Sequence, residues 1–238
     1  MALHQPDTFV RRMKIAIVGA ESTGKSQLAN LLANELRRQG QCVFLVNEYL
    51  REWCDHHGRT PRADEQAEIA REQVHRVDAA GASAISKPGT ASHVIVADST
   101  PLVTAIYSDL LFGDRSLYNL ALTHQRGYDL TLMTGLDLPW VADGLQRDGE
   151  RTREAVDSLL RAALDRGSLG YQVVYGAGPA RLTNALKAII SIANYSYRTV
   201  ATAHISSETL KKEEIWTWPC DKCSDPDCEH RLFSQLMR

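Results

Sequence analysis

The chain has 238 residues, of which 44% are hydrophobic and 24% are charged, and its formal net charge is −2. This length is enough for one α/β domain with a full core and a small appendage, and the near-zero charge gives no broad attraction to nucleic acid, so no nucleic-acid partner is expected. No apolar run approaches the length of a membrane span, and residues 1–12 are polar without the apolar core of a signal peptide, so we expect a cytoplasmic protein with no membrane attachment.

A short β-rich run, residues 13–18, comes directly before a glycine-framed loop, residues 19–26, and leucines at helical spacing follow the loop. The loop reads Gly-Ala-Glu-Ser-Thr-Gly-Lys-Ser and fits the phosphate-binding P-loop pattern G-x-x-x-x-G-K-[ST] in its required strand–loop–helix context. Glycines let the backbone curl so that its N–H groups point at phosphate oxygens, and the start of a helix adds a favourable field. The residues expected to surround a bound nucleotide are Gly19, Glu21, Ser22, Thr23, Gly24, Lys25, Ser26 and Gln27.

Three side chains of this loop need separate interpretation. Lys25 should reach the β- and γ-phosphates of ATP, and the Ser26 hydroxyl should hold Mg²⁺. Glu21 is unusual, because a carboxylate near phosphates is repulsive, so it should point either outward or toward the metal. The alternative for the whole segment is a glycine-rich turn between a strand and a helix that binds no ligand.

Apolar strand-like runs alternate with helical patterns along residues 12–200. The predicted strands are residues 13–18, 42–46, 93–97, 130–133 and 171–175. The first helix should end near Gly40, further helices should cover residues 62–80, 101–111, 152–164 and the segment after a turn at 176–179, and residues 81–92 should form a loop. This order indicates an α/β domain of the P-loop NTPase type, with a mainly parallel five-stranded sheet and helices on both faces.

Two carboxylates follow predicted strands, at the edge of the sheet where ligands of such folds bind. Asp98 ends the third strand, where it would order Mg²⁺ or a water bound to it. Glu48 follows the second strand, where it would accept the proton of a substrate hydroxyl or position that hydroxyl. The alternative for each carboxylate is that it caps a helix.

Residues 139–153, after the fourth strand, combine two Asp/Gly turns with three arginines. This composition is typical of a mobile lid whose arginines approach the γ-phosphate and offset the charge on its oxygens. The alternative is a solvated loop and helix start held by salt bridges. Trp140 either stacks on a planar ring or packs beside Pro139.

Several of these motifs occur together in the order found in one known family. The loop at residues 19–26, Asn47-Glu48-Tyr49 with Arg51-Glu52, Asp98-Ser99, and Pro139-Trp140 with Asp143-Gly144 resemble a ribosylnicotinamide kinase domain. That domain belongs to the bifunctional bacterial regulator of NAD biosynthesis and has stand-alone AAA-type ATPase relatives, and the similarity extends over residues 12–195. The resemblance implies ATP-dependent phosphorylation of the ribose 5′-hydroxyl of nicotinamide riboside.

The resemblance also implies roles for individual residues. The expected catalytic residues are Lys25, Glu48, Asp98, Arg147 and Arg151, with Ser26 and Asp98 as Mg²⁺ ligands and one of the two arginines closing with the lid. The chain departs from the family at Gln146, where an arginine usually follows the Asp-Gly pair. It also lacks a His-x-Gly-His motif for nucleotidylyl transfer, so no adenylyltransferase activity is expected.

The stretch from Cys220 to His230 supplies three thiols and one imidazole in the pattern C-x₂-C-x₄-C-x-H. Four ligands of these types in so short a segment favour a closed, structural Zn²⁺ site, with Cys220, Cys223, Cys228 and His230 as its ligands. Residues 206–238 are therefore predicted to be a Cys₃His zinc-binding appendage. A Cys-x-x-Cys redox pair and unrelated surface cysteines are the alternatives.

Two functions from different classes fit these features. The first is an ATP-dependent small-molecule kinase that phosphorylates nicotinamide riboside or a related nucleoside, with ATP, Mg²⁺ and structural Zn²⁺ as cofactors. The second is a nucleotide switch, an ATPase or GTPase, that regulates a protein partner through the zinc appendage. A protein partner or a homo-oligomer is compatible with either function.

Overall fold

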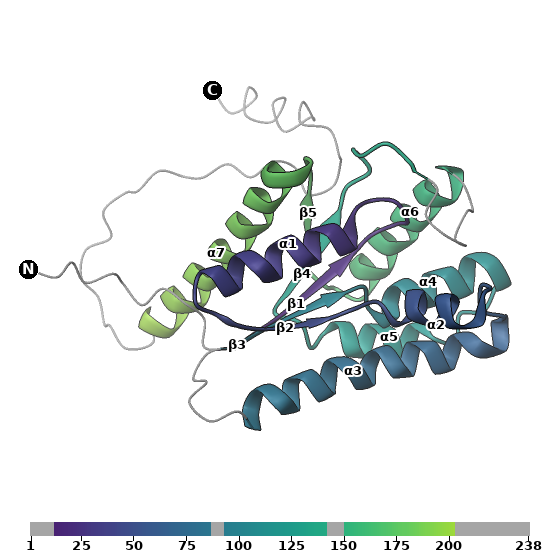
Figure 1. The fold of residues 1–238 in the computed structure, drawn as a ribbon, viewed down its shortest axis with the longest axis horizontal. Coiled ribbons are helices and arrows are strands. Elements are labelled where there is room, and N and C mark those ends of the chain that lie inside the picture. Colours follow the sequence, from purple (N-terminus) through teal and green to yellow (C-terminus); the bar gives the residue numbers. More distant parts are fainter. Residues whose placement is uncertain (1–11, 87–92, 142–149, 203–238) are drawn as a thin grey trace, which may run out of the picture. The chain divides into compact units, whose positions relative to one another are not determined.

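Five parallel strands form one sheet at the centre of the domain. The structure is a computed structural model that describes residues 12–86, 93–141 and 150–202. The strands are β1 (Arg12–Val18), β2 (Cys42–Val46), β3 (His93–Asp98), β4 (Leu130–Thr134) and β5 (Gln172–Val174), and their order across the sheet is β2-β3-β1-β4-β5 (Figure 1). Every pairing between neighbours is parallel, so the predicted parallel five-stranded sheet is confirmed.

Helices connect the strands. They are α1 (Lys25–Arg38), α2 (Tyr49–His57), a 3₁₀ turn η1 (Ala63–Glu65), α3 (Gln66–Ser86), α4 (Pro101–Phe112), α5 (Tyr118–Gln125), α6 (Glu150–Arg166) and α7 (Gly178–Thr202). The sequence does not predict α2 and α5, because helices of nine and eight residues are too short for a helical period to stand out. None of the helices in the described ranges is both long and apolar enough to cross a bilayer.

Helix α3 runs farther than the sequence predicts. Residues 81–86, which the sequence places in a loop, continue this helix to Ser86. The small side chains of this segment allow the helix to pack closely on the sheet: Ala84 is fully buried, and a Cβ at Gly81 would lie 3.6 Å from Ile95 Cδ1 of β3. The predicted loop is therefore wrong for residues 81–86, and residues 87–92 lie outside the described ranges.

Helices cover both faces of the sheet, as predicted (Figure 1). On one face, Ile15 and Ile17 of β1 pack in one cluster with leucines of α1 and with Ala185 of α7. On the other face, Val18 and Met133 pack with apolar side chains of α4, α5 and α6. Since burial of one such side chain contributes roughly 1.5–3 kcal/mol, these two layers fix the strands whose ends carry the polar residues of the site.

The carboxyl ends of the strands lie along one edge of the sheet. Strand β1 is central, and its last residues are in register with both neighbours: Ile17 pairs with Asp98 of β3, and Val18 pairs with Met133 of β4. The glycine-framed loop after β1 therefore emerges between Asp98 and residues 135–141, which follow β4. This is the edge where ligands of parallel α/β sheets bind.

Candidate functional site

The loop between β1 and α1 has the backbone that its glycines predict. Gly19 has a φ of +153° and Gly24 a φ of +76°, and Gly24 is the N-cap residue of α1. A Cβ at Gly19 would lie 2.0 Å from Thr134 Oγ1, so this position has room only for glycine. The Thr23 hydroxyl lies 2.6 Å from Ala20 O and 2.6 Å from the Thr134 hydroxyl of β4. The curled backbone is thus fixed to the sheet by its own contacts.

Lys25 begins α1 and curls over the same loop. Its Nζ donates to Ala20 O at 2.9 Å, and it is the first of the 14 residues of α1. The N–H groups of the first turn of a helix have no acceptor within the helix, and this end carries a partial positive charge. The loop, the helix start and the Lys25 amine together form an anion site of the kind that holds nucleotide phosphates.

Ser26 and Asp98 meet beside this loop. The Ser26 side chain is a neighbour of the Asp98 carboxylate, and Asp98 is only 4% exposed. Burial raises the pKa of Asp98 above its usual value, and the neighbouring Glu48 carboxylate adds to this effect. The Oδ1 atom of Asp98 is buried and accepts no hydrogen bond from the residues that the structure describes. Asp98 does not cap α4, because the N-cap residue of that helix is Thr100.

This pair of side chains suits a magnesium ion. Mg²⁺ takes oxygen ligands and is usually held by one or two protein groups, with water and substrate phosphates completing its shell. The Ser26 hydroxyl and the Asp98 oxygen that accepts no hydrogen bond are such groups. A bound dication would also lower the electrostatic cost of an ionised carboxylate in this buried position.

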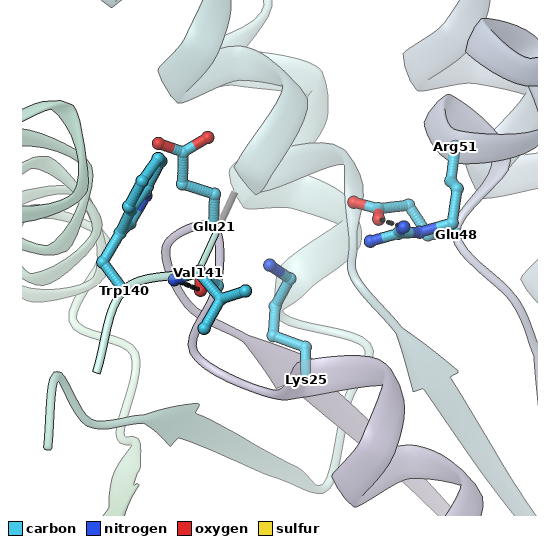
Figure 2. A pocket seen from close by; sticks show the side chains of 7 residues that line it. Glu21, Lys25, Glu48, Arg51, Trp140 and Val141 are labelled. Atoms are coloured by element: carbon cyan, nitrogen blue, oxygen red, sulfur yellow. Dashed lines mark hydrogen bonds and ion pairs between the residues drawn. The ribbon is translucent and has the colours of Figure 1, made fainter. Parts of the chain in front are cut away.

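Glu48 lies across the pocket from the loop, at the start of α2 (Figure 2). It is the N-cap residue of α2, but its carboxylate makes no capping hydrogen bond, and the residue is 7% exposed. Its Oε2 lies 3.8 Å from Arg51 Nε. The carboxylate lines the pocket. The alternative that this side chain caps α2 is not supported, because a cap would accept a hydrogen bond from the first turn of the helix.

Helix α3 holds the backbone on either side of this carboxylate. The buried Gln73 accepts a hydrogen bond from Tyr49 N–H at 2.8 Å and donates one to Asn47 O at 3.3 Å. The Arg76 guanidinium lies 4.3 Å from the centre of the Tyr49 ring, and its Nη1 is 2.6 Å from Glu52 Oε2. Sequence reasoning missed Gln73 and Arg76, because no local motif marks a residue that supports a distant turn.

Two hollows meet at Lys25. The larger has a volume of about 620 Å³ and is lined by Ser22, Gly24, Lys25, Ser26, Gln27, Arg51, Leu138, Pro139 and Val141. The narrower one, shown in Figure 2, has a volume of about 20 Å³ and is lined by Glu21, Ser22, Lys25, Glu48, Arg51, Trp140 and Val141. That space holds about one water molecule. The chain thus has a wide phosphate-side hollow and a tight carboxylate-side pocket on the two sides of one lysine.

The segment after β4 passes over the junction of the two hollows. Val141 N–H donates to Ser22 Oγ at 2.8 Å, which fastens this segment to the phosphate loop (Figure 2). The Trp140 ring lies beside the Glu21 carboxylate, across the pocket from Glu48. Glu21 is 6% exposed, so it does not point outward into solvent.

Two buried arginines anchor the same segment. Arg153 is 3% exposed, and its Nη2 donates to Leu138 O at 2.6 Å, so it acts as a support here although the sequence counts it among the lid arginines. Arg181 of α7, also 3% exposed, donates to Thr23 O and to Asp137 Oδ1, the latter at 2.7 Å. Burial lowers the pKa of Arg181. Sequence reasoning missed the role of Arg181, because the sequence marks this residue only by its position after the turn at 176–179.

The other predicted site residues fall beyond what the structure describes. Arg147 lies outside the described residues, and Arg151 is described only as part of the α6 backbone. The predicted zinc ligands also lie outside them: Cys220, Cys223, Cys228 and His230. Within residues 12–86, 93–141 and 150–202, no three His, Cys, Asp or Glu side chains are grouped as a metal site.

Comparison with known proteins identifies a family and a shared fold. The family model for the AAA domain matches residues 14–181. Two crystal structures of the NadR protein, one in complex with NAD and AMP-PNP and one in complex with NR, align with TM-scores of 0.58 and 0.57, each at 17% sequence identity. Each alignment covers 85% of this chain, and the chain spans about half of those proteins, 52% and 54% of their lengths. Among curated proteins no sequence matches.

Proposed function

The chain belongs to the AAA domain family, and we propose that within it the protein is a small-molecule kinase. The proposed reaction transfers the γ-phosphoryl group of ATP to the 5′-hydroxyl of nicotinamide riboside or a closely related nucleoside. The fold shared with the NadR structures is a P-loop kinase-like fold, and it supports a phosphotransferase. The acceptor is inferred from the pocket and from the motifs at residues 47–52 and 139–144.

The observation that carries this proposal is the junction of the two hollows at Lys25. The phosphate loop and Ser26 line the larger hollow, where a triphosphate would lie, and Asp98 is a neighbour of Ser26. A buried carboxylate, Glu48, lies on the side of the narrower pocket. A kinase needs this division, with a phosphoryl donor on one side, an acceptor hydroxyl on the other and cations between them.

In the proposed reaction, ATP and the acceptor lie on opposite sides of Lys25. ATP lies over the loop with Lys25 beside its γ-phosphate, and Ser26 and Asp98 would hold Mg²⁺, which when bound neutralises charge on the β- and γ-phosphates. The acceptor hydroxyl lies near Glu48. As the bond from its oxygen to the γ-phosphorus forms, the bond from that phosphorus to the β–γ bridging oxygen breaks and ADP keeps the electron pair. The hydroxyl proton passes to the Glu48 carboxylate.

The acceptor pocket suits a planar, positively charged ring. Nicotinamide riboside carries a positive charge on its pyridinium nitrogen, and aromatic faces and carboxylates both attract such a ring. The narrow pocket offers the Trp140 ring together with Glu21 and Glu48. One of the NadR structures of similar fold is a complex with NR, which supports the same acceptor here. Because the pocket holds about one water molecule, residues 139–141 must move aside to admit the acceptor.

A panel assay tests the proposal. The full chain is incubated with ATP, Mg²⁺ and separate nucleosides, including nicotinamide riboside, cytidine and uridine, and the products are separated by chromatography. We expect the mononucleotide of nicotinamide riboside to form faster than any other monophosphate. Hydrolysis of ATP without a phosphorylated nucleoside would contradict the kinase proposal.

The C-terminal cysteine motif supports a second candidate function. We propose that residues 12–200 form the kinase domain and that residues 206–238 bind structural Zn²⁺ through Cys220, Cys223, Cys228 and His230. Catalysis does not need such a module, so it favours a nucleotide switch that contacts a protein partner. Deletion of residues 206–238 separates the two functions: unchanged turnover with lost partner binding favours the switch. Elemental analysis should find stoichiometric zinc, and folded protein without zinc would contradict the zinc site.

A further inference from the structure

We propose that Arg51 of α2 is a catalytic residue whose guanidinium contacts the γ-phosphoryl group while it passes from ATP to the acceptor. This inference rests on the proposed kinase function and adds the cation that acts from the wall opposite the phosphate loop. The sequence analysis gives the task of offsetting charge on the γ-phosphate oxygens to an arginine of residues 139–153. Here Arg51 performs that task.

The position of Arg51 between the two hollows is the first observation. Among the described residues, those that line both hollows are Ser22, Lys25, Arg51 and Val141. Of these, Lys25 and Arg51 carry positive charge, and they come from different elements, α1 and α2. A phosphoryl group that moves between the hollows therefore passes between these two cations. Figure 2 shows the Lys25 amine on one side and the Arg51 guanidinium beside Glu48 on the other.

The charge balance of the site is the second observation. The pocket contains carboxylates of Glu21 and Glu48, with Asp98 close by. Bound ATP adds further negative charge, and the loose transition state of phosphoryl transfer spreads charge over the equatorial oxygens. Lys25 and Arg51, which line both hollows, carry positive charge that offsets this negative charge.

The support of Arg51 is the third observation. Its Nε lies 3.8 Å from Glu48 Oε2, one helical turn earlier. Gln73 holds the backbone at Tyr49, and Arg76 holds the Tyr49 ring. The first turn of α2 is thus fixed on α3, so that Arg51, although 47% exposed, projects from a rigid base. Preorganised donors stabilise a transition state without reorganisation at the moment of reaction.

The chemistry of the guanidinium explains why arginine suits this position. Its five N–H donors lie in one plane, so contact with Glu48 is compatible with donation to two phosphoryl oxygens. A lysine amine at the same position is a point charge without this fork. Arg51 itself forms and breaks no covalent bond in the reaction. Its guanidinium offsets the negative charge on the oxygens of the transferring phosphoryl group.

Kinetics of three variants test the proposal. In Arg51→Gln we expect kcat to fall by roughly 10²–10³-fold, with the Kd for MgATP changed less than about threefold, because the contact forms fully only in the transition state. Arg51→Lys should retain an intermediate rate. In Arg51→Ala, added guanidinium chloride at low concentration should restore part of the lost rate. The matched control is Arg71→Gln, which removes an exposed charge from α3 and should behave like the unchanged protein.

A binding measurement that needs no acceptor completes the test. MgADP with aluminium fluoride mimics the transferring phosphoryl group, and we expect Arg51→Gln to bind this complex at least about tenfold more weakly while binding MgADP alone normally. Equal binding of the mimic, or a kcat of Arg51→Gln within fivefold of the unchanged protein, would overturn the role of Arg51. If the mimic depends on Arg51 but no nucleoside is phosphorylated, only the proposed acceptor is wrong. If no nucleotide binds at all, both proposals fail.

Discussion

The two walls of the cleft are built in different ways. The phosphate-loop wall, residues 19–26 with the start of α1, comes from one continuous stretch whose shape depends on Gly19 and Gly24. The facing wall, Glu48 and Arg51 on α2, depends on α3, which reaches it from 24 residues farther along the chain through Gln73. The first wall is thus specified locally, whereas the second is specified by tertiary contacts. Changes to the first wall should act on bound phosphate directly, and changes to the α3 residues that support the second wall should act from a distance.

The largest effect that tests this comparison is expected from Lys25→Ala. This change removes the charge that lies between the two hollows and should lower kcat/KM by roughly 10³-fold, with the thermal unfolding temperature almost unchanged, because no core contact is lost. Steady-state kinetics and circular dichroism measure the two quantities. The control is Lys187→Ala, at an exposed position of α7. Survival of activity within a few-fold would mean that residues 19–26 do not hold the phosphates.

A smaller loss of activity, with a gain in stability, is expected from Asp98→Asn. Burial raises the pKa of Asp98, so ionising this side chain costs more in the folded protein than in the unfolded chain. That cost is fully present above the folded-state pKa and disappears as the pH falls below the pKa of the unfolded chain. Removing the charge should therefore raise the unfolding temperature in the absence of nucleotide by about 2–4 °C, the effect of about 1 kcal/mol in a domain of this size.

The same substitution should lower kcat by roughly 10²-fold and weaken the dependence of nucleotide binding on Mg²⁺, because it removes a charged metal ligand. Calorimetry at pH 7 and at pH 4 checks the stability, and the gain over the unchanged protein should be smaller at the lower pH. Asp55→Asn, at an exposed acid of α2, is the control. A loss of stability at pH 7 in Asp98→Asn would show that the carboxylate has a structural role.

The sequence predicts the strands, the phosphate loop and the two carboxylates at the edge of the sheet. The strands are predicted to within one residue at each end, because runs such as 15–18 and 94–97 are buried on both faces and read as continuous apolar segments. The loop is predicted from its contiguous pattern. Asp98 and Glu48 are predicted to lie together from the rule that the carboxyl ends of parallel strands meet at one edge.

What the sequence does not predict depends on distant contacts. Gln73 reaches Asn47 across 26 residues, and Arg181 reaches Thr23 across 158. Neither belongs to a motif, and each looks like an ordinary polar position of a helix. The extension of α3 over residues 81–86 has the same origin, because small residues that resemble chain breakers serve a close contact with β3. Pattern reasoning fails where the reason for a residue lies in another part of the fold.

An intermediate effect is expected from Gln73→Met, which keeps the volume of the side chain and removes both of its hydrogen bonds. Tyr49 N–H and Asn47 O then lose their partner, and the first turn of α2 becomes less well positioned. We expect kcat to fall by about tenfold and the stability to fall by about 1–3 kcal/mol, with the Kd for MgATP unchanged. Gln66→Met, at an equally buried glutamine of α3, controls for the loss of a buried amide. Equal loss of kcat in both variants would remove the specific role of Gln73.

The smallest effect is expected where the segment after β4 meets the phosphate-loop wall, at the hydrogen bond between Val141 N–H and Ser22 Oγ. Residues 139–141 cover the narrow pocket, and this bond must break before an acceptor enters, so its loss should favour the open arrangement. A bond of about 1 kcal/mol corresponds to about a fivefold shift in population. Ser22→Ala removes the acceptor and Val141→Pro removes the donor, and each should lower the KM for the nucleoside by about two- to fivefold with little change in kcat. Because both remove the same bond, the double variant should add nothing to either. A higher KM in both single variants would instead show that this hydrogen bond holds residues 139–141 in the position that binds the nucleoside, and that it is not a barrier to entry.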